Sequence, residues 1–297
     1  MIQYLYLGRV AYDEALLLQA ELVALRLEGR IDNTLLLLEH PPVLTLGRNA
    51  TRTNILVSNE LLASRGVTVH EINRGGDVTY HGPGQLVGYP IFDLRSLPNR
   101  KGGRFGPVDF VRSMEEALIR LCGAYGVRAD RLPGLTGVWC SSNPPTPASK
   151  SFPPAGERKI GAIGIHVSRG ITSHGFALNV TTNLDHFRLI NPCGITDRPV
   201  TSLAKELEDS ADPPSLESIA HQAARQFGLV FGEQILAIES LDAVRAHAAH
   251  SEPTPDLAPQ AQLAPPQGPQ VLGEDTPLQV PRAVERLRDP REHSVRT

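Results

Sequence analysis

The sequence has 297 residues, of which 41% are hydrophobic and 21% are charged, and its formal net charge is −3. This length predicts one or two domains, the small net charge argues against nucleic-acid binding, and no apolar run is long enough to cross a membrane. The N-terminus lacks a basic region followed by an apolar core, and the three widely spaced cysteines form no CxxC pair. We therefore expect a cytoplasmic protein without a secretory signal, a disulfide framework or a zinc site.

The first third of the chain alternates strand and helix patterns. Apolar residues at helical spacing predict an amphipathic helix over 11–27, and the continuous apolar run 34–40 predicts a buried central strand. Ser58 is placed to cap a short helix that ends at residue 64. Further strands are expected over 2–10, 43–47, 67–73 and 85–94.

The middle of the chain predicts a long helix over 107–125, with Pro107 in its first turn. Residues 159–168 and 172–180 have the pattern of two antiparallel strands that turn at Arg169-Gly170. Between them and the long helix, residues 141–157 are rich in Pro and Ser without periodicity, which predicts an exposed insertion. The remaining elements expected are strands over 127–132 and 137–140 and helices over 215–227 and 232–249.

Strands and helices mix without strict βαβ alternation, and no internal repeat is visible. This pattern predicts an α+β fold with a mixed, largely antiparallel sheet flanked by helices. We expect one domain over residues 1–250. Residues 251–297 are rich in Pro, Gln and Ala and bury too little apolar area to offset the entropy of ordering, so a disordered tail is expected there.

The stretch Arg74-Gly75-Gly76-Asp77-Val78-Thr79-Tyr80-His81-Gly82-Pro83-Gly84-Gln85 is the most unusual part of the sequence. Its glycines are too many for the interior of a strand or helix. They predict turns, or backbone that lies close to a ligand such as a phosphate. A surface hairpin that happens to contain His81 explains the same composition.

Cys193 stands in Asn191-Pro192-Cys193-Gly194. A lone cysteine is more often a small buried hydrophobe than a reactive group, and Cys122 and Cys140 are interpreted in that way. Cys193 differs because a proline and a glycine fix a bend and leave no bulk beside the sulfur. This environment suits a nucleophile.

Lys159 begins the apolar, small-residue strand Lys159-Ile160-Gly161-Ala162-Ile163-Gly164. One interpretation is a strand-end lysine whose ammonium reaches solvent. The other is an ammonium held in a pocket with a floor of small residues, where it would lower the pKa of a neighbouring thiol and carry a proton. A weaker feature is Ser173-His174-Gly175-Phe176-Ala177-Leu178-Asn179, which has one large side chain between two small ones.

These four motifs, in this order and with 34 positions between Lys159 and Cys193, resemble the octanoyl-acyl-carrier-protein:protein octanoyltransferases, also called lipoate-protein ligase B. The resemblance covers residues 2–230. It implies the fold shared by lipoate and biotin ligases. It also implies transfer of an octanoyl chain from acyl carrier protein to the ε-amine of a lysine, by way of an enzyme thioester.

The resemblance assigns roles to individual residues. It implies that Cys193 is the nucleophile and that Lys159 is its acid/base partner. It further implies that His81 lies near the thiol. The acyl pocket it implies is lined by Arg74, Gly75, Gly76, Asp77, Val78, Thr79, Tyr80, His81, Ala162, Ile163, Gly164, Gly175, Phe176 and Ala177.

The resemblance also implies partners and the absence of cofactors. The donor is octanoyl-acyl carrier protein. The acceptors are lipoyl domains of 2-oxoacid dehydrogenase complexes and the glycine cleavage H protein. Because a thioester is already activated, the reaction needs no ATP and no metal. A monomer is expected.

Three other functions fit parts of the pattern. An ATP-dependent lipoate or biotin ligase would use the same fold through an acyl-adenylate, but it has no need of a Cys/Lys pair. A hydrolase that uses Cys193 with His81 or His174 would pass the acyl group to water instead of an amine. An inactive carrier-binding scaffold would take up no acyl group. The insertion at 141–157 and the tail after Ser251 depart from the family pattern without altering the motif residues.

Overall fold

The computed structural model describes residues 1–98, 102, 105–141, 156–191, 198–207 and 214–252. The chain divides into two compact units, residues 1–258 and 259–297. The tail expected after residue 251, most of the insertion expected at 141–157 and Cys193 lie outside the described residues.

The strands of the first unit are β1 (Ile2–Arg9), β2 (Asn33–Glu39), β3 (Val43–Leu46), β4 (Thr68–Glu71), β5 (Val78–His81), β6 (Gln85–Ile91), β7 (Ala129–Leu132), β8 (Leu135–Cys140), β9 (Arg158–Ser168), β10 (Ile171–Asn179) and β11 (Ile235–Ala237). The helices are α1 (Tyr12–Leu27), α2 (Asn59–Ser64), α3 (Pro107–Ala124), α4 (Leu203–Leu207), α5 (Leu216–Phe231) and α6 (Leu241–His250), with short 3-10 turns η1 (Arg52–Asn54), η2 (Leu94–Ser96) and η3 (Leu184–Leu189).

Eight strands form the main sheet in the order β11-β1-β2-β6-β10-β9-β8-β7. Strand β1 pairs in parallel with β11 and β2, and the other neighbours pair antiparallel. The sheet is therefore mixed and largely antiparallel, and the expected fold class is confirmed. The hairpin expected at residues 159–180 is β9 and β10, which turn at Arg169 (φ 50°) and Gly170 (φ 86°).

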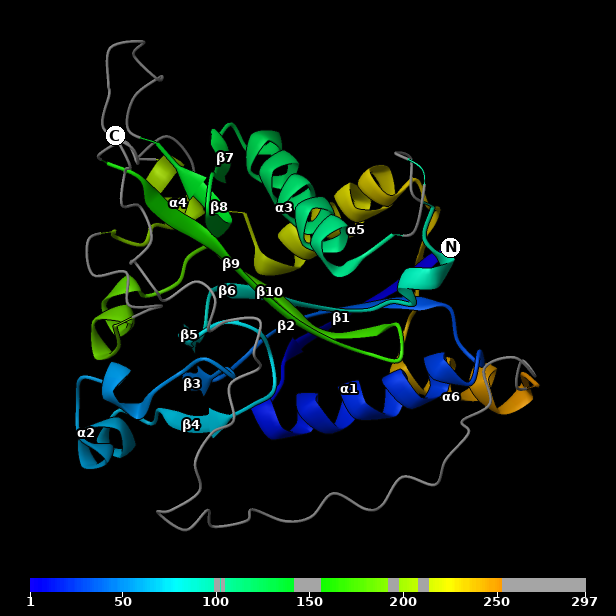
Figure 1. The fold of residues 1–297 in the computed structure, drawn as a ribbon, viewed down its shortest axis with the longest axis horizontal. Helices are drawn as coiled ribbons and strands as arrows, with labels where there is room; N and C mark the ends of the chain where they lie inside the picture. The colour runs from blue at the N-terminus through cyan, green and yellow to red at the C-terminus, as the bar shows by residue number, and fades with distance from the viewer. Residues whose placement is uncertain (99–101, 103–104, 142–155, 192–197, 208–213, 253–297) are drawn as a thin grey trace, which may run out of the picture. The chain divides into compact units, whose positions relative to one another are not determined.

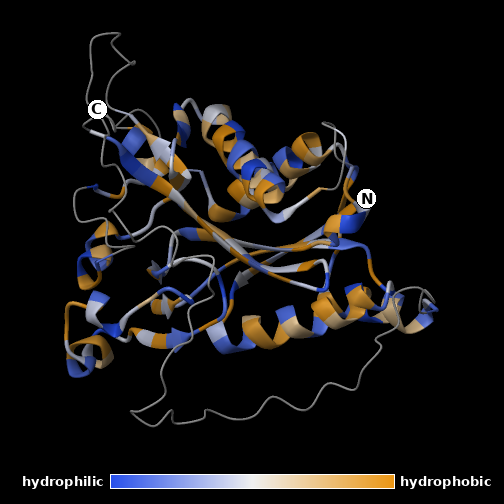
Figure 2. Ribbon diagram, in the orientation of Figure 1, coloured by the Kyte–Doolittle hydropathy of each residue, from blue (hydrophilic) through white to orange (hydrophobic). Residues whose placement is uncertain are grey.

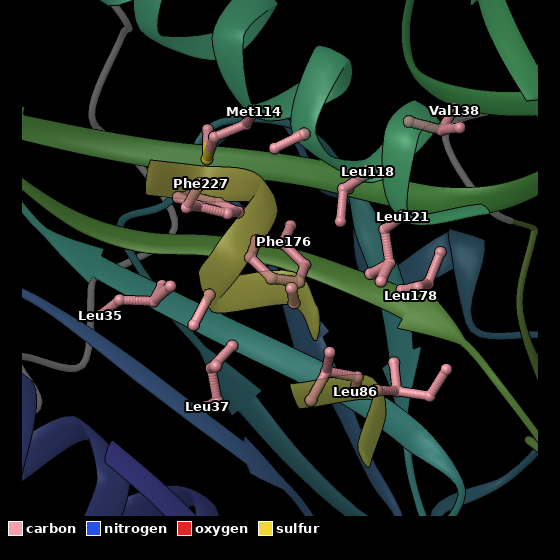
Figure 3. Packing of buried hydrophobic residues seen from close by; sticks show 14 of the residues in the cluster. Leu35, Leu37, Leu86, Met114, Leu118, Leu121, Val138, Phe176, Leu178 and Phe227 are labelled. Atoms are coloured by element: carbon pink, nitrogen blue, oxygen red, sulfur yellow. The ribbon is translucent and has the colours of Figure 1, made fainter. Parts of the chain in front are cut away.

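Helices cover both faces of this sheet. Figure 1 shows α3 and α5 on one face and α1 with α6 on the other. Figure 3 shows the core beneath α3 and α5, where Phe176 of β10 faces Phe227 of α5; their ring centroids are 5.5 Å apart. A second core lies beneath α1, and hydrophobic and hydrophilic stretches alternate along α1, α3 and α5 (Figure 2).

A smaller sheet, β4-β3-β5, contains the middle of the glycine-rich stretch, Val78–His81. We expected too much glycine there for a regular strand, and this expectation is wrong for Val78–His81. These four residues pair antiparallel with β3, from Val43↔His81 to Leu46↔Val78. The glycines flank the strand on both sides, so its own residues include β-branched and aromatic types that suit a sheet.

Local sequence signals fix several element ends. Ser58 Oγ accepts from the backbone N–H of Leu61 at 3.3 Å, and this cap starts α2 as expected. The helix expected over 232–249 is wrong in its first part. Gly232 ends α5 in the left-handed conformation at φ 71°, strand β11 follows, and α6 begins only after the cap residue Ser240.

Candidate active site

A pocket lies where β8, β9 and β10 meet β5 and the chain that follows residue 197. We call it the lysine pocket, and its cavity volume is about 70 Å³. Its lining residues are Val78, Thr79, Gln85, Trp139, Lys159, Ile160, Gly161, Ala162, Ile163, Ala177, Asn179, Phe187, Arg198 and Val200. Most of the wall is aliphatic or aromatic, so the pocket suits an apolar chain that ends in a polar group.

Lys159 is fixed in this pocket through its backbone. Its N–H donates to the carbonyl of Pro199 at 2.9 Å, and its carbonyl accepts from the N–H of Thr201 at 2.9 Å. The residues that follow position 197 therefore pair with the first residues of β9. This pairing brings Arg198 and Val200 into the wall that holds the lysine.

Two cationic side chains lie close to the indole ring of Trp139. The Nζ of Lys159 lies 5.1 Å from the ring centroid and the guanidinium carbon of Arg198 lies 5.8 Å from it. Both distances are within the range of a cation–π contact. The indole N–H of Trp139 and one guanidinium nitrogen of Arg198, Nη1, are buried and have no hydrogen-bond acceptor among the described residues. The pocket therefore offers hydrogen-bond donors to an oxygen atom of a bound molecule.

A hydrogen-bond chain connects the glycine-rich stretch to the backbone beside Lys159. His81 Nδ1 pairs with Gln85 Oε1 at 2.8 Å, and Gln85 Nε2 donates to Asn179 Oδ1 at 2.9 Å. Asn179 Nδ2 then donates to the carbonyl of Thr201, whose N–H bonds to Lys159. This chain fixes β5, β6 and β10 relative to the lysine.

A second pocket shares the lining residues Thr79, Ala162, Ile163 and Ala177 with the lysine pocket. We call it the histidine pocket, and its cavity volume is about 40 Å³. Its other lining residues are Tyr12, Arg74, His81, Val87, Tyr89, Gly164, His174, Gly175 and Phe176.

The histidines in and beside this pocket are neutral at physiological pH. Burial lowers the pKa of His81 to about 3, and neighbouring His40 lowers it further. Burial also lowers the pKa of His40 and of His174 to about 4 each, with the Arg74 guanidinium adding to the effect at His174. Neutral imidazoles each keep one nitrogen that accepts hydrogen bonds.

His174 has an unusual backbone and an unpaired ring atom. Its φ of 54° lies in the left-handed region although it is in strand β10. Its backbone N–H donates to Gln19 Oε1 at 2.8 Å, and its Nε2 pairs with Asn73 Oδ1 at 2.7 Å. Within the described part of the chain its Nδ1 is buried without a partner, so the histidine pocket contains an open acceptor.

The glycine-rich stretch is organised by Arg74 and by close backbone contacts. The Arg74 guanidinium donates to the carbonyls of Thr45, Gly75 and Asp77 at 2.6–2.9 Å. A Cβ on Gly164 would lie 2.6 Å from the carbonyl oxygen of Gly75. The glycines at 75 and 164 therefore allow the loop to cross β9 at van der Waals distance.

The structure brings many of the expected pocket residues together. Arg74, Val78, Thr79 and His81 line one or both pockets, and so do residues 162–164 and 175–177. Gly75, Gly76, Asp77 and Tyr80 do not line either pocket. Tyr80 points to the small sheet's own core, where its hydroxyl pairs with His186 Nδ1 at 2.5 Å. Phe176 lines the histidine pocket, but its ring stacks on Phe227 in the main core.

Cys193, the expected nucleophile, lies outside the described residues. The described residues on either side of it, Asn191 and Arg198, both line a hollow that adjoins the lysine pocket and shares Phe187, Arg198 and Val200 with it. The N–H of Asn191 is anchored to the carbonyl of Asn54 at 2.7 Å. Both ends of the segment that carries Cys193 are thus fixed beside the lysine pocket.

Sequence reasoning missed several lining residues of these pockets. Trp139, Arg198 and Asn179 line the lysine pocket, and Tyr12 and Tyr89 line the histidine pocket. The sequence offered one signal for these residues, which is Asn179 at the end of an apolar strand. A buried side-chain amide in that position needs hydrogen-bond partners. In the described part of the chain, no three His, Cys, Asp or Glu side chains are grouped to hold a metal ion. Among the same residues, no helix has the length and apolar character that a membrane crossing requires.

Comparison with known proteins agrees with this geometry. The lipoyl protein ligase A/B catalytic domain family matches residues 11–228. An octanoyltransferase of Acidobacterium capsulatum is 59% identical over 245 residues, which cover 81% of this chain and 94% of that protein. An octanoyltransferase of Koribacter versatilis is 54% identical over 242 residues, which cover 82% and 89%.

Solved structures support the fold. A bipartite lipoate protein ligase from Thermoplasma acidophilum matches with a TM-score of 0.59 and 17% identity, over 84% of this chain and 91% of that chain. Lipoate-protein ligase A bound with ATP matches with a TM-score of 0.58 and 15% identity, over 84% and 93%. The expected ligase-like fold is confirmed. The chain therefore belongs to the lipoyl protein ligase A/B catalytic domain family, and within it to the octanoyltransferases, which are acyltransferases.

Proposed function

We propose that this protein transfers an octanoyl group from octanoyl-acyl carrier protein to the ε-amine of a lysine on lipoyl domains, through a thioester on Cys193. This is the first step of endogenous protein lipoylation. The observation that carries the proposal is the pairing of Lys159 with residues 199–201 in the wall of an apolar pocket. The octanoyl transfer itself follows from the family, whereas the carrier donor, the acceptor domains and the thioester are our proposal.

Chain connectivity supports Cys193 as the nucleophile. Cys193 is two residues after the anchored Asn191 in the sequence. Asn191 lines the hollow that adjoins the lysine pocket. The other two cysteines are poor candidates because both are fully buried, and burial raises the pKa of each thiol, to about 12 at Cys140 and still higher at Cys122.

The first half-reaction joins the acyl group to the enzyme. Lys159 accepts the proton of the Cys193 thiol, and the thiolate attacks the thioester carbonyl carbon of the donor. Negative charge then develops on the carbonyl oxygen, and the unpaired donors on Trp139 and Arg198 suit that charge. The carbon–sulfur bond to the carrier breaks, and the carrier thiolate takes its proton from Lys159.

The second half-reaction passes the acyl group to the acceptor. The lysine amine of the lipoyl domain attacks the enzyme thioester, the amide bond forms, and the thiol of Cys193 is restored. The nitrogen gives up its proton to Lys159 as the carbon–sulfur bond breaks, and Lys159 returns that proton to the sulfur. No ATP or metal takes part, since the donor thioester is already activated. Ping-pong kinetics are the expected signature.

The pocket walls support an eight-carbon substrate. Val78, Ile160, Ile163 and Phe187 give the lysine pocket its aliphatic and aromatic surface. The residues proposed for acyl binding remain Arg74 to His81, Ala162 to Gly164 and Gly175 to Ala177. The proposed residues that line a pocket contact the acyl chain directly. Arg74 also shapes the loop around it.

The proposed partners follow from the same assignment. The Thermoplasma ligase is described with its E2 lipoyl domain, and we propose lipoyl domains of 2-oxoacid dehydrogenase complexes and the glycine cleavage H protein as acceptors here. We also propose that the enzyme acts as a monomer in the cytoplasm. Both cysteines in the described residues are free thiols, which suits a reducing compartment.

A transfer assay tests the proposal against its alternatives. Purified protein is mixed with octanoyl-acyl carrier protein and a lipoyl domain, and the acceptor's mass is followed. We expect octanoyl amide without added ATP, none with Cys193→Ala, and wild-type rates with Cys140→Ala. Undiminished transfer by Cys193→Ala would overturn the proposal. Product formed only from free octanoate with ATP would identify a ligase, and free octanoate as the main product would identify a hydrolase.

A further inference from the structure

Lys159 lies against a glycine of the neighbouring strand. Gly137 of β8 has a φ of 125°, a conformation that residues with a Cβ rarely adopt. A Cβ at this position would lie 2.8 Å from Cε of Lys159 and 3.4 Å from its Nζ. It would also lie 2.6 Å from the carbonyl oxygen of Gly161. The aliphatic part of the lysine therefore occupies the space that a side chain at position 137 would need.

The pairing of β8 with β9 changes at this point. Val138 pairs with Gly161, but Trp139 pairs with Lys159, so the register shifts between adjacent residues. This irregularity puts Trp139 and Lys159 opposite each other and aims the lysine across the ring. Gly137 lies just beyond the last residue of β8 that pairs with β9, Val138, so its backbone N–H needs another acceptor.

That acceptor is a buried carboxylate on α3. Glu115 has no exposed surface, and its Oε1 accepts the Gly137 N–H at 3.0 Å. Its Oε2 accepts from Arg112 Nη1 at 2.6 Å and from Arg131 Nε at 3.1 Å. Figure 1 shows α3 running beside β7 and β8, which is where these groups meet. A carboxylate with no exposed surface needs such partners. Among the described hydrogen bonds, Oε1 of Glu115 accepts only from Gly137.

We propose that Glu115 and Gly137 are positioning residues for Lys159. Glu115 fixes the backbone of Gly137, and Gly137 then presents a face without a side chain against which the lysine lies. The Nζ of Lys159 lies over the ring of Trp139, 5.1 Å from the ring centroid. A flexible four-carbon side chain is thereby held in one arrangement at the pocket. This inference rests on the proposed function, in which Lys159 is the acid/base group.

The first test adds the missing methyl group. Gly137→Ala should lower octanoyl transfer about 100-fold, because misplacing a catalytic group by about 1 Å costs that much. It should also raise the pH midpoint for alkylation of Cys193 by iodoacetamide towards the free-thiol value of about 8.5, measured on the Cys193 peptide. Gly134→Ala is the matched control. Gly134 also has a positive φ, of 79°, but a Cβ there would meet no atom within 4 Å.

The second test removes the carboxylate. Glu115→Leu leaves the Gly137 N–H without its acceptor and should reproduce the loss of transfer and the shifted alkylation midpoint. Glu115→Gln keeps an oxygen at the same place and should restore most of the rate. Glu116→Gln is the control, since Glu116 bonds to Arg120 and Arg131 but not to Gly137. Circular dichroism reports the folded fraction of each variant.

A double-mutant cycle separates positioning from a general structural role. In a Lys159→Ala background, adding Gly137→Ala or Glu115→Leu should change the residual rate per folded molecule by less than about threefold. An additional loss as large as in the wild-type background would overturn the inference. So would an unchanged alkylation midpoint in both single variants. Full activity of Lys159→Ala would instead overturn the proposed role of Lys159 itself, so the two failures are distinguishable.

Discussion

The two pockets share four lining residues and differ in their ionisable groups. The lysine pocket contains Lys159, Arg198 and the indole N–H of Trp139, all of which donate hydrogen bonds or carry positive charge. The histidine pocket contains Arg74 together with His81 and His174, whose pKa values of about 3 and about 4 keep the imidazoles neutral. Thr79, Ala162, Ile163 and Ala177 line both pockets. The first pocket thus has two cations beside an aromatic ring, and the second has neutral imidazoles beside one arginine.

The difference arises from which backbone segments close each pocket. The lysine pocket is closed by β8 and by residues 198–200, which bring two cations to one aromatic ring. The histidine pocket is closed by the glycine-rich loop and by the start of α1, which bury imidazoles deeply enough to discharge them. The proposed thiol chemistry suits the lysine pocket, because a neighbouring ammonium stabilises a thiolate and a neutral imidazole does not.

The largest effect is expected from removing the cation of the lysine pocket. Lys159→Met keeps the aliphatic length beside Gly137 but removes the proton carrier, and we expect transfer to fall by about 10³-fold. Lys205→Met is the matched control, because Lys205 lines only the adjoining hollow and should lose less than about threefold. Initial rates with saturating octanoyl-acyl carrier protein measure both. If the transfer rate of Lys159→Met fell by less than tenfold, the proton carrier would not be in the lysine pocket, and the proposed difference in role between the two pockets would be wrong.

The second-largest effect is expected when the indole N–H of Trp139 is removed but an aromatic ring is kept at that position. Trp139→Phe keeps the aromatic face beside Lys159 but lacks the indole N–H, and loss of one oxyanion donor costs about 10²-fold. The reaction of Cys193 with methyl methanethiolsulfonate forms no oxyanion, so its rate should be unchanged. Parallel assays of transfer and of this thiol reaction provide the comparison. Equal losses in both reactions would show that Trp139 supports the thiolate and not the carbonyl oxygen.

The third effect concerns the stability of the fold instead of the transfer rate, and it involves the histidine pocket. In the unfolded chain each histidine binds a proton near pH 6.5, whereas folded His174 does so only near pH 4. Stability is therefore complete above pH 6.5 and falls as the pH is lowered towards 4, by about 3 kcal/mol for His174 at roughly 1.4 kcal/mol per pKa unit.

Urea unfolding between pH 7.5 and pH 4.5 measures this dependence. His174→Asn suits the left-handed backbone at φ 54° and does not titrate, so it should make the pH dependence of the midpoint shallower. The exposed His247→Asn is the control and should leave the dependence as it is. The same slope in His174→Asn and in the native protein would show that His174 is not held neutral by the fold.

The sequence was sufficient for most elements and for the pocket position of Lys159. Lys159 at the start of an apolar strand with small residues was predicted in a pocket, and the structure has it there. The hairpin of β9 and β10 was predicted from its turn. These features depend on neighbours within a few residues, which a single sequence displays directly.

The features that could not be predicted depend on long-range contacts. Arg198 and Trp139 are 59 positions apart, and their meeting requires the irregular β8–β9 register together with the return of the chain to Lys159. Tyr80 stands among pocket residues in the sequence, but strand alternation turns its ring to His186. Gly232 fits a helix interior or a helix end equally well until β11 is seen to pair with β1.

The intact mass of the protein after mixing with octanoyl-acyl carrier protein, in the absence of an acceptor, tests the thioester proposal most directly. We predict that the protein gains the mass of one octanoyl group, that hydroxylamine removes it, and that Cys193→Ser does not acquire it under the same conditions. An unmodified protein that still transfers octanoyl groups to a lipoyl domain would contradict a covalent intermediate on Cys193.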